Sequence, residues 1–198
     1  MQGIDESAPL VRHADYMSKM APTATDMLLL LGIVGAGLLS GLYFIFSFCV
    51  MWSLNKQGPA TAIIIMNSIN VEILNPTFYT VFMGTPLVCA LLLFRSWWDG
   101  LWKTQSVYMA TGAASTLIGE FAVTATINVP KNDALMAYEL GSGDDASLWS
   151  NYYTSWTTWN TVRMTASIIT VLLFSWTLRL RGTEVGVLTS EEATTRSA

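Results

Sequence analysis

Four long segments of this 198-residue chain are nearly free of charged residues, and they constrain its fold more than any other feature. They lie at about 27–54, 77–95, 104–129 and 160–180. Each reaches or approaches the ~20 residues that a helix needs to cross a hydrocarbon core about 30 Å thick. Charged residues make up only 12% of the chain, about half the fraction found in soluble domains. The sequence therefore predicts an all-α fold, a four-helix transmembrane bundle.

The connection between the first two predicted spans, residues 61–74, is too short to cross a membrane and is interrupted by Asn67, Asn70 and Glu72. Ala62, Met66, Ile69 and Ile73 recur within it at helical spacing. We therefore expect a short amphipathic helix that lies in the membrane interface.

Polar tails are expected on both sides of one membrane domain, residues 27–181: an N-terminal tail at 1–26 and a C-terminal tail at 182–198. The long polar stretch before the first span differs from a cleaved signal peptide, so we expect that span to be retained. Basic residues are more frequent on the side of the two termini, which predicts that both termini are cytoplasmic. That side holds Arg12, Lys19, Arg95, Lys103, Arg179, Arg181 and Arg196, and the other side holds Lys56 and Lys131.

Composition excludes several function classes. The net charge of −4 and the absence of a basic stripe argue against a nucleic-acid partner. His13, in the N-terminal tail, is the one histidine of the chain, so no histidine-ligated metal site is expected in the bundle. No glycine-rich phosphate loop follows a strand, and we expect neither a nucleotide nor any other cofactor. The functions that remain possible are binding of a flat, partly apolar molecule, stabilisation of an anion and proton transfer.

Polar residues gather, on the predicted topology, at the non-cytoplasmic end of the bundle. Arg163 lies near the head of the last span, where an arginine is costly unless water, a carboxylate or a ligand meets it. Asn160 precedes it by one turn, and Trp156 and Trp159 share helix faces with these two residues. Glu120 is the one carboxylate inside a predicted span, and it could contact Arg163 across facing helices.

Asparagines from other segments are predicted at the same end. Asn70 lies in the interfacial helix and Asn75 follows it, while Asn128 and Asn132 follow the third span. Each feature also has a structural explanation: hydrogen bonding and capping for the asparagines, interface anchoring for the tryptophans, and packing for the Glu120–Arg163 pair. Small residues of the first span, Gly32, Gly35, Gly37 and Gly41, are expected to permit close helix approach.

Three blocks of the sequence resemble the signature blocks of the anthrone-oxygenase-like integral membrane family. They read IMNSINVEILNP at 65–76, VTATINVPKNDAL at 123–135 and WTTWNTVR at 156–163. The resemblance runs from about residue 38 to 180 and implies a four-span bundle. Named members of that family, in fungal polyketide pathways, resemble oxygenases that convert an anthrone into an anthraquinone with O₂ and no evident cofactor.

The resemblance implies roles for matching residues. Arg163 and Asn160 would stabilise the substrate anion, and Asn132 and Asn75 would orient substrate oxygens. Many relatives have a histidine where this chain has Thr161, so a possible base is missing. Glu120 lies outside the blocks and is a candidate base only as the single intramembrane carboxylate. The catalytic candidates are thus Arg163, Asn160, Asn132 and Glu120, and the substrate-binding candidates are Asn75, Asn128, Trp156, Trp159 and Asn70.

Two hypotheses about function follow. The first is a cofactor-independent oxygenase, or related enzyme, that acts on a hydrophobic aromatic ketone. The second is a non-enzymatic membrane protein, either a binder of a small molecule or lipid, or a structural subunit of a larger membrane complex. The expected partners are therefore the lipid bilayer, a hydrophobic small molecule and further membrane subunits.

Overall fold

The computed structural model describes residues 21–195, and all regular secondary structure in that range is helical. Five continuous helices follow one another, which confirms the all-α prediction. The first contains α2 (Ala24–Ile45), the π-helical segment η1 (Phe46–Val50) and α3 (Met51–Asn55); α4 (Pro59–Glu72) and α5 (Pro76–Asp99) follow; the fourth contains α6 (Thr104–Ala114), the π-helical segments η2 (Ser115–Ala122) and η3 (Thr124–Asn128), and α7 (Val129–Met136); the last is α8 (Asp145–Thr195).

Three helices are long and apolar enough to cross a membrane: Ala24–Asn55, Pro76–Asp99 and Asp145–Glu184. Their outer faces are apolar, and on α2 the side chains of Leu31, Val34 and Leu38 are all more than half exposed. A soluble monomer rarely exposes so large an apolar surface. The chain is therefore an integral membrane protein.

The segment predicted as a span at 104–129 is not one of those three, although it lies within one continuous helix, 104–136. Glu120 and many Thr, Ser and Gly residues lower the mean hydropathy of this helix. It extends beyond the predicted end because α7 continues the π-helical segment η3 without a break.

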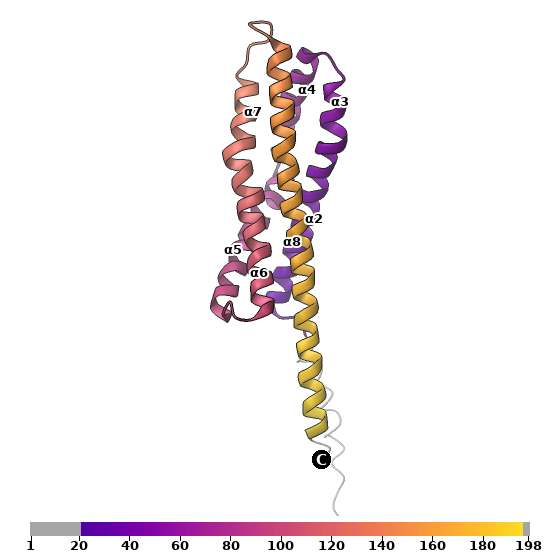
Figure 1. Ribbon diagram of the computed structural model, residues 1–198, viewed down its shortest axis with the longest axis vertical. Helices are drawn as coiled ribbons and strands as arrows, with labels where there is room; N and C mark the ends of the chain where they lie inside the picture. The colour runs from indigo at the N-terminus through magenta and orange to yellow at the C-terminus, as the bar shows by residue number, and fades with distance from the viewer. Residues whose placement is uncertain (1–20, 196–198) are drawn as a thin grey trace, which may run out of the picture.

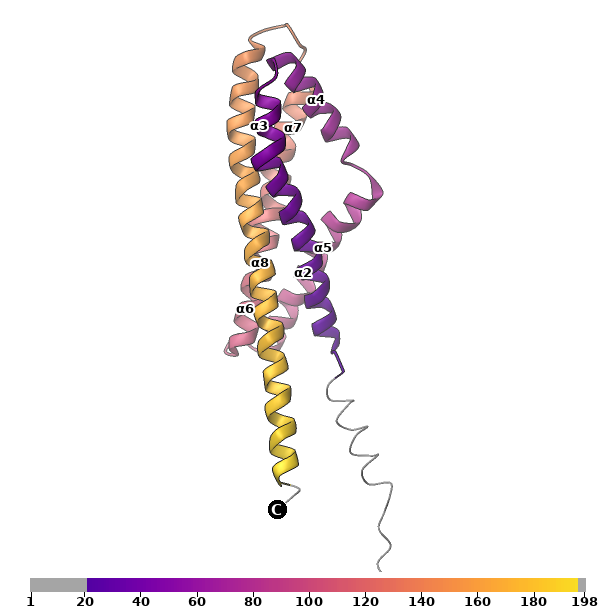
Figure 2. The ribbon, with the colours of Figure 1, turned by 90° about the vertical axis from the view of Figure 1, so that its right-hand side faces the viewer.

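The helix of α2 and α3, the helix 104–136 and α8 run along the long axis of the molecule (Figure 1). α2 packs against α5 and α8, and α6 also packs against α5 and α8, so these four helices enclose one core. At the other end of the molecule α4 packs against α7 and α8. Figure 2 shows α4 inclined to the long axis and meeting α5 at an apex that is set away from the other helices.

α4 is helical as predicted, but its residues do not divide into an apolar and a polar face. Ala62, Ile63 and Met66 are buried against the bundle, whereas Ile64 and Val71 are each more than half exposed. The helix is apolar on both sides because Ile63, Ile64 and Ile65 are consecutive and therefore point in different directions around the helix. The helix α4 is therefore not amphipathic.

α8 differs from the predicted last span at both ends. It begins at Asp145 rather than near residue 160, and the aromatic residues Trp149, Tyr152 and Trp156 in its first turns are buried core residues. They pack with Met51, Ile63, Met66 and Leu135. At the other end the backbone stays helical through 182–195, where an irregular tail was expected. The expected N-terminal tail lies, except for residues 21–26, outside the described residues.

Two of the predicted packing glycines lie at tight contacts. A Cβ on Gly32 would come within 2.6 Å of the Phe174 ring, and one on Gly35 would overlap the Thr85 side chain. The prediction was wrong for Gly37 and Gly41, where a Cβ would meet nothing within 4 Å. These two face outward, because residues on one helix face recur every three or four positions.

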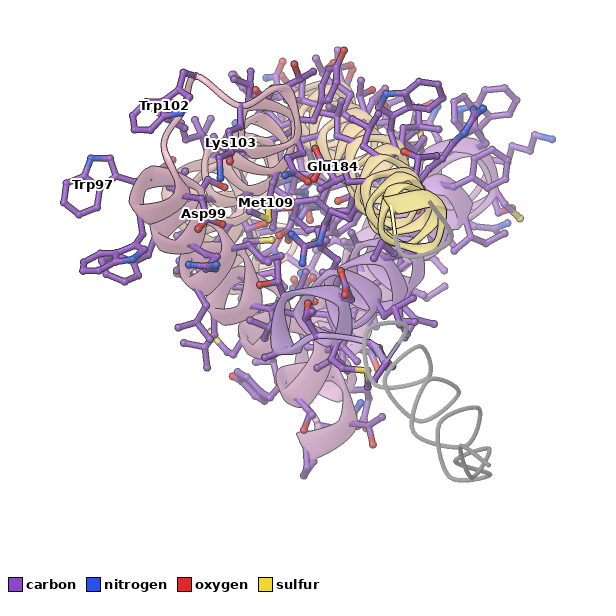
Figure 3. The ribbon with its side chains drawn as sticks, turned by 90° about the horizontal axis from the view of Figure 1, so that it is seen from below. Trp97, Asp99, Trp102, Lys103, Met109 and Glu184 are labelled. Atoms are coloured by element: carbon purple, nitrogen blue, oxygen red, sulfur yellow. The ribbon has the colours of Figure 1, made fainter. Side chains whose placement is uncertain are left out.

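The end of the bundle where α5 stops and α6 begins carries ion pairs and exposed indoles. Asp26 binds Arg181 at 2.6 Å there, and Arg95 binds Asp99 at 2.8 Å. Figure 3 shows Trp97 and Trp102 pointing away from the helices at this end. Tryptophans and charged residues in this arrangement are typical of a membrane–water boundary.

Candidate functional site

A cavity of about 450 Å³ lies where α2, α4, α5, α7 and α8 meet, on the inner side of the α4–α5 apex. Most of its wall is apolar. Of the residues proposed from the sequence, five line it: Arg163, Asn160, Asn132, Asn70 and Trp156. The cavity is large enough for a tricyclic molecule, and its dimensions are those of a small-molecule site.

Arg163 is the charged centre of this cavity and is only 6% exposed. Its Nη2 donates to Asn160 Oδ1 at 2.7 Å, and its Nη1 donates to Thr124 Oγ1 at 3.2 Å. Its guanidinium carbon lies 4.5 Å from the ring centroid of Tyr43 and 5.3 Å from that of Trp156. Cation–π contacts of this kind are strongest where water is excluded. All four of these contacts to the guanidinium come from uncharged groups.

Asn160 fixes the position of Arg163. It is fully buried, and its Nδ2 donates to the Tyr43 carbonyl at 2.7 Å and to Ser47 Oγ at 2.8 Å. Both ends of this amide are thus used within the protein, because its oxygen already accepts from Arg163. Asn160 is therefore better placed to orient the guanidinium than to bind a ligand itself.

Glu120 lies behind the cavity wall and is fully buried. Its Oε1 accepts a 2.5 Å hydrogen bond from the Tyr43 hydroxyl, and its Oε2 has no partner among the described residues. Glu120 and Arg163, which the sequence suggested could be in contact, form no direct ion pair in the described part of the chain. Tyr43 lies between them instead, with its hydroxyl on Glu120 and its ring beneath the guanidinium.

The opposite wall is organised by Asn132, on α7. Its Oδ1 accepts hydrogen bonds from the Tyr152 hydroxyl at 2.9 Å and from Trp156 Nε1 at 2.8 Å. Asn70, on α4, lies near the same Tyr152 hydroxyl, yet its Nδ2 forms no hydrogen bond of good geometry within the described residues. Asn132 thus fixes two aromatic side chains, and Asn70 keeps a hydrogen-bond donor without a well-placed acceptor.

Four sequence candidates lie outside the lining. Asn128 is buried and donates to the Trp156 carbonyl at 3.4 Å, and Glu120 lies behind Tyr43. Asn75 is exposed and caps α5 by accepting from the Phe78 N–H, and Trp159 is partly exposed on the outer side of α8. Asn75 and Trp159 are therefore unsuited to bind a ligand in this cavity.

Sequence reasoning missed Tyr43, Ser47 and Thr124, which complete the polar cluster. Tyr43 and Ser47 are four residues apart in the first span, so they share one helix face. That spacing is the signal that could have identified them. The three π-helical segments carry Ser47, Glu120 and Thr124, and π-helical turns occur frequently at functional sites.

Within the described residues, no group of three His, Cys, Asp or Glu side chains could hold a metal ion. The polar groups of the lining residues are a guanidinium, two phenols, a threonine hydroxyl, three amides, one indole and the carboxylate of the exposed Asp133. They can bind the oxygens of a flat molecule, stabilise its negative charge and, through the Tyr43–Glu120 pair, accept a proton.

Residues 77–173 match the family described as anthrone oxygenase. Over these residues the chain is similar to the anthrone oxygenase family. The matched residues contain two of the three sequence blocks, together with Glu120, Asn132, Asn160 and Arg163. Tyr43 and Asn70 lie outside them. No curated protein and no solved structure matches the chain significantly.

Proposed function

We propose that this protein is a cofactor-independent oxygenase that converts a hydrophobic aromatic ketone of the anthrone class into the corresponding quinone with O₂. The observation that carries the proposal is the cluster of Tyr43, Glu120 and Arg163 at a largely apolar cavity. This cluster pairs a proton acceptor with a fixed positive charge in a water-poor site. Formation of a carbon-derived anion requires both.

Four membrane crossings follow if the three long apolar helices all span the bilayer. α5 and α8 run in the same direction along the bundle (Figure 1). The chain must therefore return between them, and the helix 104–136 is the segment that does so. Its deep Glu120 faces the bundle interior rather than lipid, which is where intramembrane carboxylates are tolerated. The excess of basic residues favours a cytoplasmic location for the Asp26–Arg181 end.

Helix geometry supports a location of the cluster near the other membrane boundary. Seventeen residues separate Asp26 from Tyr43, and eighteen separate Arg163 from Arg181. At the helical rise both separations correspond to about 26 Å, slightly less than the thickness of a hydrocarbon core of about 30 Å. The cavity then lies at the non-cytoplasmic edge of the hydrocarbon region, and exposed apolar residues of its rim, Val71 and Leu74, face the lipid. A substrate dissolved in the bilayer can enter there.

The first chemical step is removal of a proton from the methylene carbon of the anthrone. Tyr43 lines the cavity and donates to Glu120, so its oxygen can accept the substrate proton as its own proton passes to Glu120. The resulting anion is delocalised onto the ketone oxygen. Arg163 stabilises this charge, because its guanidinium is already oriented by Asn160 and Thr124.

The second step is the reaction of this anion with O₂. One electron passes from the anion to O₂, the resulting carbon radical and superoxide combine, and a proton from Glu120 gives a hydroperoxide. Loss of water then forms the second carbonyl. In sum, one methylene and one O₂ yield one ketone and one water, so no other oxidant or reductant is needed. Trp156, held by Asn132, provides a flat surface for the ring system.

The test uses the full chain in lipid nanodiscs, treated with a chelator and supplied with 1,8-dihydroxyanthrone. We expect ligand binding, seen as quenching of tryptophan fluorescence, and O₂ consumption faster than in empty nanodiscs. Arg163→Met, with a side chain of similar length and no charge, should lower the turnover by about 10²-fold or more. Binding without any enhancement of O₂ consumption would exclude the oxygenase and identify a ligand-binding protein.

A further inference from the structure

Two residues that line the cavity carry a buried hydrogen-bond donor that forms no hydrogen bond of good geometry within the described residues. Among the described residues, several buried side-chain nitrogen and oxygen atoms have no partner, and two of these belong to residues that line the cavity. They are Arg163 Nε and Asn70 Nδ2. The two residues are 6% and 9% exposed, so bulk water does not readily satisfy these donors. A buried donor without a partner destabilises the protein, and a ligand oxygen would remove that cost.

The chemistry of these two atoms restricts the ligand. Both are donors, and none of the unpaired buried atoms of the lining residues is an acceptor. A ligand that satisfies both donors must therefore carry two acceptor oxygens and an apolar body. Asn70 lies on α4 and Arg163 on α8, so the two donors belong to different walls of the cavity. A flat diketone, with one carbonyl on each side of its central ring, fits this pattern.

We propose that Asn70 is a second recognition residue, which binds an oxygen on the side of the ligand opposite Arg163 and makes the cavity select diketones over monoketones. This inference rests on the proposed function and adds to it. An anthrone has one ketone oxygen, which binds Arg163. Its oxidation creates a second ketone at the opposite carbon, and Asn70 Nδ2 donates to that new oxygen. The product therefore binds more tightly than the substrate.

One net hydrogen bond to a buried amide corresponds to about a tenfold difference in affinity at its upper range. Product release should then limit turnover at saturating substrate. Removal of the Asn70 amide would weaken product inhibition, and it would leave the binding of the monoketone unchanged. A merely structural role for Asn70 would affect both ligands alike, which separates the two explanations.

The test compares 1,8-dihydroxyanthrone with 1,8-dihydroxyanthraquinone, which differ at one carbon, as ligands of the full chain in nanodiscs under argon. Dissociation constants are measured by quenching of tryptophan fluorescence. In the unsubstituted protein the quinone should bind about tenfold more tightly. In Asn70→Leu the two constants should become equal, with that of the anthrone changed less than about threefold. Ser68→Leu, an exposed substitution on the same helix, should keep the tenfold preference.

Equal constants in the unsubstituted protein, or an equal weakening of both ligands by Asn70→Leu, would overturn the role of Asn70 and leave the proposed oxygenase intact. If neither ligand binds the unsubstituted protein, the proposed function fails and this inference with it. Asn70→Asp provides the second variant in case the leucine impairs folding. It retains the shape of the side chain, replaces the donor by an acceptor, and should also abolish the preference for the quinone.

Discussion

The Tyr43 hydroxyl donates a 2.5 Å hydrogen bond to Glu120, which lies 77 residues further along the chain and is fully buried. The contact joins the first helix to the helix that contains the π-helical segments. It gives the deep carboxylate access to the cavity, because Tyr43 lines the cavity and Glu120 does not. Any proton exchanged between a ligand and Glu120 therefore passes through one phenol group.

Tyr43→Phe removes this phenol group and keeps the ring beneath Arg163. Turnover of 1,8-dihydroxyanthrone should fall by about 10²-fold or more, because the proton acceptor of the cavity is lost. The dissociation constant of the ligand should change little. Steady-state O₂ consumption and anaerobic binding measure the two effects separately. Tyr108→Phe, on a helix segment that does not line the cavity, is the matched control and should retain full turnover.

Glu120→Gln and Glu120→Ala should separate catalysis from stability. Glutamine can still accept from the Tyr43 hydroxyl through its amide oxygen, so the protein should fold with unchanged thermal stability but lose turnover. Alanine leaves the hydroxyl without a partner and should destabilise the fold by about 1–3 kcal/mol. Melting in detergent, followed by circular dichroism, measures this difference. Equal turnover in Glu120→Gln and the unsubstituted protein would show that the carboxylate takes no proton.

Arg163→Lys should behave almost as poorly as Arg163→Met. The guanidinium uses two nitrogens for Asn160 and Thr124 and lies over Tyr43, a planar arrangement that an ammonium group cannot reproduce. We expect turnover to fall by about 10²-fold in both variants. Retention of near-normal turnover in the lysine variant would mean that positive charge alone is sufficient and that the fixed geometry has no role.

Gly35→Ala and Gly37→Ala form a matched pair for helix packing. A Cβ at Gly35 overlaps the Thr85 side chain, whose hydroxyl is bonded to Val81, whereas a Cβ at Gly37 meets nothing within 4 Å. The first substitution should destabilise the protein by about 1–3 kcal/mol, and the second should change its stability by less than about 0.5 kcal/mol. Similar melting temperatures for the two variants would contradict the close approach of α2 and α5.

The helical fold and the polar side chains on α8 could be predicted from the sequence because each depends on local properties. A charge-poor run of sufficient length indicates a spanning helix, and residues three or four apart share a face. The same rules placed Asn160 and Arg163 correctly as neighbours. They could not decide which asparagines turn inward. Asn70 faces the cavity, whereas Asn75 caps α5, because the path of the chain at the α4–α5 apex depends on tertiary packing.

The role of Tyr43 could not be predicted from the sequence for a similar reason. Its partners Glu120, Asn160 and Arg163 come from two other helices. The packing of these helices decides which residues of the first span face the partners. The extent of α8 was also misjudged. Buried aromatics such as Trp149 and Tyr152 resemble an interfacial belt in composition, and only their packing against α3, α4 and α7 distinguishes a core from a belt.

Oxidation of 1,8-dihydroxyanthrone under ¹⁸O₂ tests the central claim most directly. The full chain in chelator-treated nanodiscs should produce the anthraquinone with one ¹⁸O atom in the new ketone and the other in water. The rate should exceed those of empty nanodiscs and of Arg163→Met by about 10²-fold. Formation of the quinone at the rate of empty nanodiscs, or without incorporation of ¹⁸O, would contradict the account.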